Sequence, residues 1–328
     1  MGLLLALALL GIAALLTFGL GLHRKARYIH NFEEAEYGAN EPFVEPVSVV
    51  DGLAVYTAGS GEPALLLPYP HGHTTEPMVQ GPLAEILVSM GRTVVTFDVP
   101  GAYRSTREPA GDMEEMIQCA DEALDRLGIQ GPVDVLGHSM GGLAALAYGI
   151  ERPERTRRLV LVASLSGFPA AARWGLPGSA YRFYEPDYWR IILWGMRLNA
   201  GHGDLALHKR LQNLMACATY HDEAFFRPVA IDNDDAEKGV PIRTLWSRNM
   251  YTRLSYADRL GEVRAPTLIL AGRHDPEAPL PCSEELLHGI PAARLVIFEE
   301  SGHSPFIEEV ALFAQTVDGF LNKQDEGR

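Results

Sequence analysis

Two kinds of hydrophobic pattern alternate along most of the chain. Short, nearly continuous apolar segments, typical of strands buried on both faces, occur at residues 64–67, 93–97, 133–136, 159–163, 267–271 and 295–298. Segments with apolar residues every three to four positions, typical of helices with one buried face, occur at residues 82–90, 112–127, 140–151, 283–287 and 305–321. This alternation predicts an α/β fold with a mainly parallel sheet and helices on both of its faces.

The folded domain is expected to open with an antiparallel hairpin. Residues 47–50 and 53–57 have the composition of strands and flank the dipeptide Asp51-Gly52. This dipeptide tolerates the positive φ angles of a tight two-residue turn. Two antiparallel strands therefore precede the parallel part of the sheet.

The alternation is interrupted between residues 167 and 263. No buried-strand segment occurs there, and helical stretches alternate with turn residues. The interval contains a set of large aromatic residues: Trp174, Phe183, Tyr184, Tyr188, Trp189, Trp194, Phe225, Phe226 and Trp246. It is predicted to be an inserted helical cap, whose rings either form the core of the cap or contact an apolar substrate group.

The first 22 residues differ from the rest of the chain. Residues 2–22 carry no charge, and as a helix they would span about 30 Å, the thickness of a bilayer core. Because Arg24, Lys25 and Arg27 follow this segment, an uncleaved transmembrane anchor is favoured over a signal peptide. The basic flank predicts that the N-terminus lies outside and the folded domain in the cytoplasm. The alternative is secretion after cleavage of a signal peptide.

The chain after residue 22 divides into three parts. Residues 23–42 are polar and acidic and are predicted to be a linker. Residues 43–322 are predicted to form the folded domain, with the cap inserted at 167–263. Residues 323–328 form a short tail.

Composition excludes several classes of function. The 328 residues include 42 acidic and 28 basic side chains, which gives a formal net charge of −14. No long Lys/Arg run is present, so the basic surface that nucleic-acid binding needs is missing. The three cysteines, Cys119, Cys217 and Cys282, form no C-x-x-C pair, which argues against a disulfide framework or a thiolate metal site.

A candidate nucleophile lies in the segment Gly-His-Ser-Met-Gly-Gly at residues 137–142. It matches the pattern G-x-S-x-G and stands directly between a predicted strand and a predicted helix. The glycines relieve crowding in the sharp turn that such a strand-to-helix junction requires. The turn would present the hydroxyl of Ser139 at the carboxyl edge of the sheet.

A serine hydroxyl needs a base, and the base needs an orienting acid. Asp275 follows the strand at 267–271, and His303 follows the strand at 295–298. Because the loops after parallel strands open at one edge of the sheet, Ser139, Asp275 and His303 are predicted to meet there. His274 and His138 are rival candidates for the base. His303 is favoured over both, because His274 is expected to point elsewhere and His138 sits within the turn itself.

These motifs resemble those of the α/β-hydrolase superfamily over roughly residues 43–321. The segment Phe-Asp-Val-Pro-Gly at 97–101, with Arg104 and Ser105, and the segment Gly-His-Ser-Pro-Phe-Ile-Glu-Glu at 302–309 are similar to segments of that family. The resemblance implies an eight-stranded sheet and a helical cap after the sixth strand. It also implies an acyl-enzyme mechanism in which Ser139 attacks a carbonyl, His303 moves the proton and Asp275 orients His303, without a cofactor.

The resemblance implies an oxyanion hole built from two backbone N–H groups. One belongs to Met140, the residue after the nucleophile. The other is assigned to His73, on the assumption that residues 68–70, Pro-Tyr-Pro, are an insertion before His71-Gly72. The competing interpretation of His71, His73 and Glu76 as metal ligands lacks further ligands nearby in sequence.

The sequence therefore favours a membrane-anchored serine hydrolase that cleaves a carboxylic ester or a related acyl bond of an apolar small molecule. The Gly-His-Ser-Met-Gly-Gly turn resembles that of esterases, lipases and carbon–carbon hydrolases more than that of proline iminopeptidases. An aminopeptidase remains an alternative, with Glu185, Asp187, Asp222 and Glu223 of the cap available to hold an amine. Acyl transfer to an acceptor other than water stays open, and so does a non-catalytic binding protein on the same fold.

Overall fold

A computed structural model describes residues 44–70, 78–174, 193–194, 217, 219–226 and 254–323. The predicted anchor at 1–22, the linker at 23–42 and most of the predicted cap lie outside these residues, and so do His71, His73 and Glu76. Among the helices of the described ranges, none has the length and apolarity needed to cross a bilayer.

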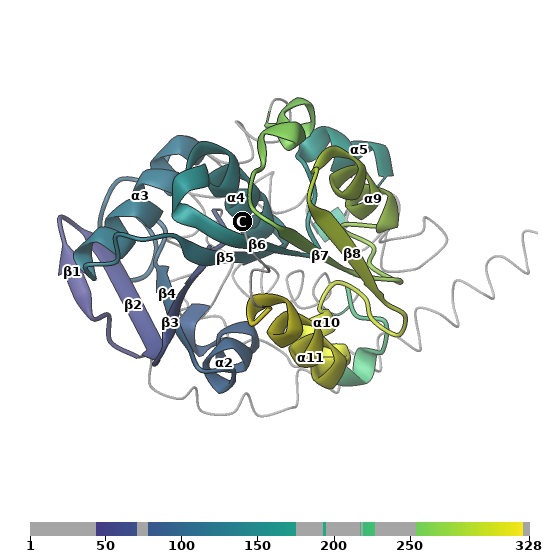
Figure 1. The fold of residues 1–328 in the computed structure, drawn as a ribbon, viewed down its shortest axis with the longest axis horizontal. Helices are drawn as coiled ribbons and strands as arrows, with labels where there is room; N and C mark the ends of the chain where they lie inside the picture. Colours follow the sequence, from purple (N-terminus) through teal and green to yellow (C-terminus); the bar gives the residue numbers. More distant parts are fainter. Residues whose placement is uncertain are drawn as a thin grey trace, which may run out of the picture.

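An eight-stranded sheet runs through the centre of the molecule (Figure 1), in the order β1-β2-β4-β3-β5-β6-β7-β8. Its strands are β1 Ser48–Val50, β2 Leu53–Gly59, β3 Glu62–Leu66, β4 Arg92–Phe97, β5 Val133–His138, β6 Thr156–Val162, β7 Thr267–Gly272 and β8 Ala293–Phe298. The pairs β1–β2 and β2–β4 are antiparallel, and the remaining pairs are parallel. The prediction of a mostly parallel eight-stranded sheet is confirmed.

The hairpin at the start of the domain has the predicted two-residue turn. Val50 pairs with Leu53, and the φ angles of Asp51 and Gly52 are 46° and 74°. Two consecutive positive φ angles match the right-handed twist of the flanking strands.

Helices cover both faces of the sheet (Figure 1). One face carries α2 Pro82–Ser89, α10 Pro305–Glu308 and α11 Val310–Leu321, and the other carries α3 Met113–Arg126, α4 Ser139–Glu151, α9 Leu280–Gly289 and the short α5 Phe168–Trp174. Strand side chains alternate between two buried cores, as period-two geometry requires. Leu65 and Leu161 pack into the core with α3, α4 and α9, whereas Leu66 and Val160 pack into the core with α2 and α11.

The N-terminus of α3 illustrates how local sequence sets an element boundary. The Asp112 carboxylate accepts a hydrogen bond from the Glu115 N–H at 3.0 Å, and the Glu115 carboxylate accepts one from the Gly111 N–H. The first hydrogen bond satisfies an N–H group that the first helical turn leaves without a partner, and the second binds the residue before the cap to the same turn. The periodic apolar side chains that follow, such as Met116 and Ala120, are buried against the sheet.

The interval 305–321 forms two helices instead of the single helix predicted. Glu309 lies between α10 and α11 and leaves the helical conformation, with φ −125° and ψ 49°. Its carboxylate accepts hydrogen bonds from the Ser301 hydroxyl and the Glu300 N–H. Hydrogen bonds with the preceding loop therefore stabilise the break between the two helices. The hydrophobic pattern alone does not indicate this break.

The two chain segments that connect the cap to the sheet body lie side by side. Gly167 forms an antiparallel bridge with Ser255, and the Tyr256 N–H donates to the Ser166 carbonyl at 2.7 Å. The short 3-10 helix η4 Ala257–Glu262 and Val263 pack into the core that includes α4 and α9. The return to the sheet body thus comes near residue 255, ahead of the limit of 263 expected from sequence.

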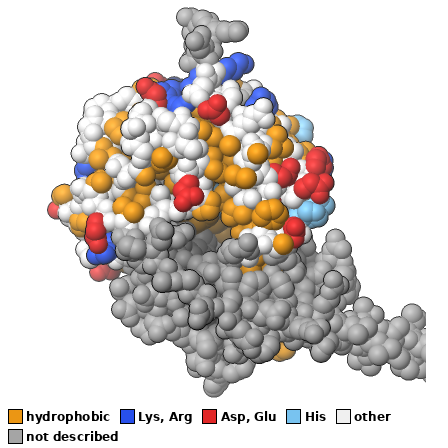
Figure 2. All heavy atoms as spheres, turned by 90° about the horizontal axis from the view of Figure 1, so that it is seen from below, with side chains coloured by type: hydrophobic (Ala, Val, Ile, Leu, Met, Phe, Trp, Pro, Cys, Tyr) orange, Lys and Arg blue, Asp and Glu red, His pale blue; other side chains and the backbone are white. Residues whose placement is uncertain are grey.

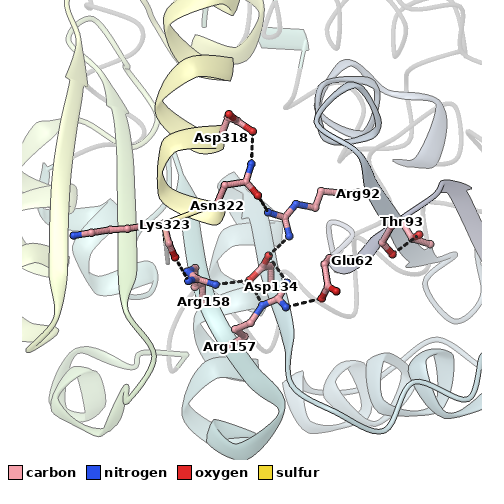
Figure 3. A network of polar contacts seen from close by, with 10 residues as sticks. Glu62, Arg92, Thr93, Asp134, Arg157, Arg158, Asp318, Asn322 and Lys323 are labelled. Atoms are coloured by element: carbon pink, nitrogen blue, oxygen red, sulfur yellow. Dashed lines mark hydrogen bonds and ion pairs between the residues drawn. The ribbon is translucent and has the colours of Figure 1, made fainter. Parts of the chain in front are cut away.

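A buried ion network ties the N-terminal ends of the parallel strands together (Figure 3). The fully buried Asp134 of β5 pairs with Arg92 of β4 at 3.1 Å and with Arg157 of β6 at 2.8 Å. Arg157 also pairs with Glu62 of β3 at 2.7 Å. Asn322, just after α11, accepts a second hydrogen bond from Arg92. This network lies at the opposite edge of the sheet from the predicted site.

Replacing Asp134 should therefore destabilise the fold strongly. Asp134→Ala leaves the largely buried guanidinium of Arg92 without its carboxylate, and we expect a loss of about 3–5 kcal/mol in the free energy of unfolding, measured by urea titration. Glu62→Gln removes an exposed partner of the same network and should cost no more than about 1 kcal/mol. Equal stability of Asp134→Ala and the unmodified protein would contradict this account.

Candidate active site

The candidate nucleophile Ser139 is the first residue of α4, directly after β5. Its φ angle is 53°, a left-handed conformation that is uncommon for residues other than glycine. The side chain is partly exposed, although both neighbours, His138 and Met140, are buried. The turn therefore has the strained geometry predicted from the G-x-S-x-G pattern.

Two glycines make this turn possible. A Cβ atom at Gly137 would lie 2.0 Å from the Gly141 carbonyl oxygen, and one at Gly141 would lie 2.5 Å from the Leu67 carbonyl oxygen. No side chain fits at either position, because real Cβ contacts are essentially never shorter than 3.0 Å. The close approach brings the start of α4 beside the end of β3.

Asp275 lies in the turn that follows β7 and is 4% exposed. One carboxylate oxygen, Oδ1, accepts hydrogen bonds from the N–H groups of Glu277 and Ala278, at 2.8 and 2.9 Å. The other oxygen, Oδ2, lies 2.8 Å from Nδ1 of His303. The two backbone hydrogen bonds hold the carboxylate in place, so it can fix the orientation of the imidazole.

His303 lies in the loop between β8 and α10 and is 6% exposed. Burial acts to lower the pKa of this imidazole, but the charges of Asp275 and Glu277 outweigh it and raise the pKa to about 9. The second ring nitrogen, Nε2, lies 3.4 Å from the Glu277 carboxylate. His303 is thus placed between two carboxylates, one at each ring nitrogen.

Ser139 is close to this pair through its neighbour His138. The rings of His138 and His303 are 4.6 Å apart between centroids, and the His138 Nε2–H donates to the His303 carbonyl at 2.8 Å. Among the described residues, the Ser139 hydroxyl has no hydrogen-bond partner. Such contacts are often loose without substrate and tighten in the Michaelis complex.

The rival histidines have other surroundings. The buried His138 donates through Nε2, so its Nδ1 is the acceptor for the Tyr69 hydroxyl, and its ring also contacts Phe306. Burial and the charge of His303 lower the pKa of His138 to about 3, which keeps the ring neutral. His274 is exposed and stacks on His221 of the cap, with 3.8 Å between ring centroids. Neither ring is placed like that of His303.

The two predicted oxyanion donors differ in what the structure describes. Met140 is the second residue of α4, where backbone N–H groups have no partner within the helix. His73 lies outside the described residues, and so do the proposed metal ligands His71 and Glu76. Within the described part of the chain, no group of three or more side chains could hold a metal ion.

A segment of the cap is docked directly on the loop that carries His303. The His303 N–H donates to the Thr219 carbonyl at 2.8 Å. The Glu308 carboxylate of α10 accepts from the N–H groups of His221 and Gly302, at 2.7 and 2.8 Å. These contacts couple the position of the cap to that of the candidate base. Of the cap acids noted in the sequence, Asp222 and Glu223 lie in this docked segment.

A hollow of about 120 Å³ lies beside His138, between the start of α2 and α10. Its lining is mostly apolar and consists of Tyr69, Met78, Gly81, Pro82, Leu83, His138 and Phe306. Figure 2 views the molecule from the side of α2 and α11, where hydrophobic side chains are spread between acidic ones. The hollow can accept an apolar group next to the residue that precedes Ser139.

Two residues of this arrangement were not identified from sequence. Glu277 stands two positions after Asp275 in the same loop, so its proximity to that candidate was the available signal. Tyr69 belongs to the segment 68–70, which was assumed to be an insertion before the oxyanion loop, and it contacts His138. Only the fold shows that both side chains reach the histidine pair.

Comparison with known proteins places these features in a family. Residues 71–310 match the family model described as the alpha/beta hydrolase fold. A 2-hydroxymuconate semialdehyde hydrolase of Pseudomonas putida is 33% identical over 281 residues, which cover 83% of this chain and 91% of that protein. A pimeloyl-[acyl-carrier protein] methyl ester esterase of Vibrio vulnificus is 29% identical over 272 residues, covering 81% and 97%.

A solved structure gives the same assignment of fold. The structure of an alpha/beta fold family hydrolase from Bacillus anthracis superposes with a TM-score of 0.64 at 24% identity, covering 81% of this chain and 94% of that chain. The residues matched by the family model include the turn at Ser139 and the loops of Asp275 and His303. The chain is a hydrolase and belongs to the α/β-hydrolase fold family.

Proposed function

We propose that this hydrolase cleaves a carboxylic ester through Ser139, His303 and Asp275. The observation that carries the proposal is the left-handed Ser139 turn next to a buried His303–Asp275 pair, all at the carboxyl edge of one sheet. The methyl ester esterase among the relatives supports ester chemistry.

Each residue has a distinct role in the proposed reaction. The Ser139 oxygen attacks the ester carbonyl while its proton passes to Nε2 of His303. Asp275 holds Nδ1 and stabilises the imidazolium, and the Met140 N–H binds the oxyanion. The tetrahedral intermediate expels the alcohol, which takes the proton from His303. Water then attacks the acyl-enzyme with His303 as base and releases the acid and Ser139.

The substrate is proposed to carry an apolar group. The hollow beside His138 has a mostly apolar lining, and Tyr69 offers it one polar edge. Its volume of about 120 Å³ is smaller than that of a typical small-molecule site, so it accommodates only part of a substrate. An ester with a short apolar chain fits these surroundings.

Hydrolysis of 2-hydroxymuconate semialdehyde is a second candidate. The relative that bears this name is 33% identical over most of both chains. The same nucleophile, base and acid would serve this reaction, so the distinction rests on the substrate pocket.

We further propose that the enzyme is anchored to a membrane by residues 2–22, with the hydrolase domain in the cytoplasm. The support is the uncharged length of this segment and the basic residues that follow it, Arg24, Lys25 and Arg27.

The proposed roles predict a steep loss of activity in single variants. Ser139→Ala, His303→Ala and Asp275→Asn should each lower kcat/KM for p-nitrophenyl esters by about 10³-fold or more, because the three groups act as a unit. His274→Ala is the matched control, since this exposed histidine adjoins Asp275 in sequence and should leave kcat/KM unchanged.

A panel of substrates separates the alternatives. It contains p-nitrophenyl esters of increasing chain length, 2-hydroxymuconate semialdehyde and an aminoacyl anilide. Turnover of the ester series, with an optimum in chain length, supports the esterase. Turnover of 2-hydroxymuconate semialdehyde alone favours the second candidate, and turnover of an aminoacyl anilide alone favours an aminopeptidase. The absence of any turnover, together with no labelling of Ser139 by a serine-directed probe, would leave a binding protein.

Activity should rise towards alkaline pH. His303 accepts a proton only in its neutral form, and its raised pKa means that this form appears at higher pH than for an ordinary histidine. We expect kcat/KM for a neutral ester to increase about tenfold per pH unit at neutral pH and to level off near pH 9. A profile that levels off below pH 7 would contradict the proposed electrostatics.

The anchor is tested by membrane fractionation. The full chain should remain in the membrane pellet after alkaline carbonate washing, whereas a chain that starts at Asn31 should be released, because only the former has the apolar segment. If the full chain is expressed and a shortened form, with a new N-terminus within or after residues 19–22, is recovered outside the cell, the segment is a signal peptide instead.

A further inference from the structure

One short turn supplies carboxylates to both ring nitrogens of His303. Asp275 Oδ2 lies 2.8 Å from Nδ1, and Glu277 Oε2 lies 3.4 Å from Nε2. The Glu277 N–H donates to Asp275 Oδ1, so the two residues are fixed relative to each other. About a quarter of the Glu277 side chain is exposed, and it forms an ion pair with His303 when that ring is protonated. Burial raises the pKa of the Glu277 carboxyl, and the charge of His303 acts in the opposite direction.

The surroundings of His303 are otherwise acidic or neutral. From the turn after β7 it faces Asp275 and Glu277, and Glu308 of α10 adds a more distant negative charge. From the end of β5 it faces the neutral ring of His138, which accepts from the hydroxyl of Tyr69 after β3. Burial raises the pKa of Tyr69, so this group stays uncharged. Glu277 is therefore the only carboxylate on the Nε2 side among these described groups.

The position of Glu277 conflicts with the role of Nε2 in the proposed reaction. That nitrogen must be unprotonated to accept the Ser139 proton, but a carboxylate attracts it as a protonated donor. With Asp275 at Nδ1 and Glu277 at Nε2, the imidazolium has an acceptor for each N–H. The resting arrangement thus favours the form of His303 that cannot act as a base.

We propose that Glu277 is a further active-site residue, which holds the Nε2 proton of His303 in the resting enzyme and so sets the pH range in which His303 acts as a base. The inference rests on the proposed function, because it assigns a role to Nε2 as the acceptor of the Ser139 proton. Substrate or higher pH frees Nε2 from Glu277, and the neutral base then faces Ser139.

The first test compares pH profiles of kcat/KM for a neutral p-nitrophenyl ester. Glu277→Gln keeps the shape of the side chain and removes its charge, so the acidic limb should move down by about one pH unit or more, which gives about tenfold higher kcat/KM at neutral pH. Glu300→Gln is the matched control, because Glu300 is an exposed acid beside the same loop that pairs with His221 instead. Its profile should coincide with that of the unmodified enzyme.

A second measurement follows His303 itself in the protein without substrate. Histidine-selective ¹⁵N NMR, with the signal assigned from its loss in His303→Gln, should give a lower titration midpoint in Glu277→Gln and in Glu277→Leu than in the unmodified protein. A loss of activity at every pH with an unmoved midpoint would overturn the inference and leave Glu277 a structural residue. Equal shifts in Glu300→Gln would overturn it too.

The two measurements separate this inference from the proposed function. If the midpoint moves but the unmodified protein hydrolyses no ester, the control of His303 by Glu277 stands and the esterase assignment fails. The other outcome is that esters are hydrolysed with the expected dependence on Ser139 while Glu277→Gln shifts neither the acidic limb of the pH profile nor the titration midpoint of His303. In that case only the role of Glu277 fails.

Discussion

The left-handed backbone at Ser139 is the constraint around which the candidate site is built. A φ of 53° at a non-glycine residue costs of the order of 1–3 kcal/mol and persists only where the surroundings leave no alternative. Here the surroundings are backbone atoms: Gly137 faces the carbonyl of Gly141, and Gly141 faces that of Leu67. These close approaches draw β5, α4 and β3 together. As a result, Ser139 and Met140 both lie at the carboxyl edge of the sheet, at the start of α4.

Charged side chains are arranged differently at the two edges of the sheet. At the N-terminal edge, Asp134 pairs with the guanidinium groups of Arg92 and Arg157, and Arg157 also pairs with Glu62. At the carboxyl edge, the carboxylates of Asp275 and Glu277 flank the two ring nitrogens of His303. The perturbed pKa of His303 at this edge is typical of a functional site.

The cap is part of this design because it contacts the loop of the candidate base. The Thr219 carbonyl accepts from the His303 N–H, and Glu308 binds N–H groups on both sides of the junction. A displacement of the cap would therefore change the backbone that carries the imidazole. The docked segment and the loop of the candidate base are thus linked by a main-chain hydrogen bond and by the Glu308 carboxylate.

The amino-acid sequence by itself determined the order of strands and helices, the parallel sheet and the candidates Ser139, Asp275 and His303. It could do so because these features depend on local signals: apolar runs, the Asp51-Gly52 turn and a reactive residue directly after each strand. The sequence did not predict the break between α10 and α11 at Glu309 or the return of the chain from the cap near Ser255. Both depend on hydrogen bonds with other segments of the chain.

Only the tertiary structure decided which ring atom meets which group. Asp275 and His303 are 28 positions apart, and His138 and His303 are 165 positions apart, so no local propensity specifies their contacts. The contact of Glu277 with His303 also joins positions far apart in the sequence, so the local pattern did not reveal it. The same holds for His138, whose neutral ring connects the Tyr69 hydroxyl with the His303 backbone. Pairing of distant strands brings these atoms within 2.8–3.4 Å, where charge and hydrogen bonding set their protonation.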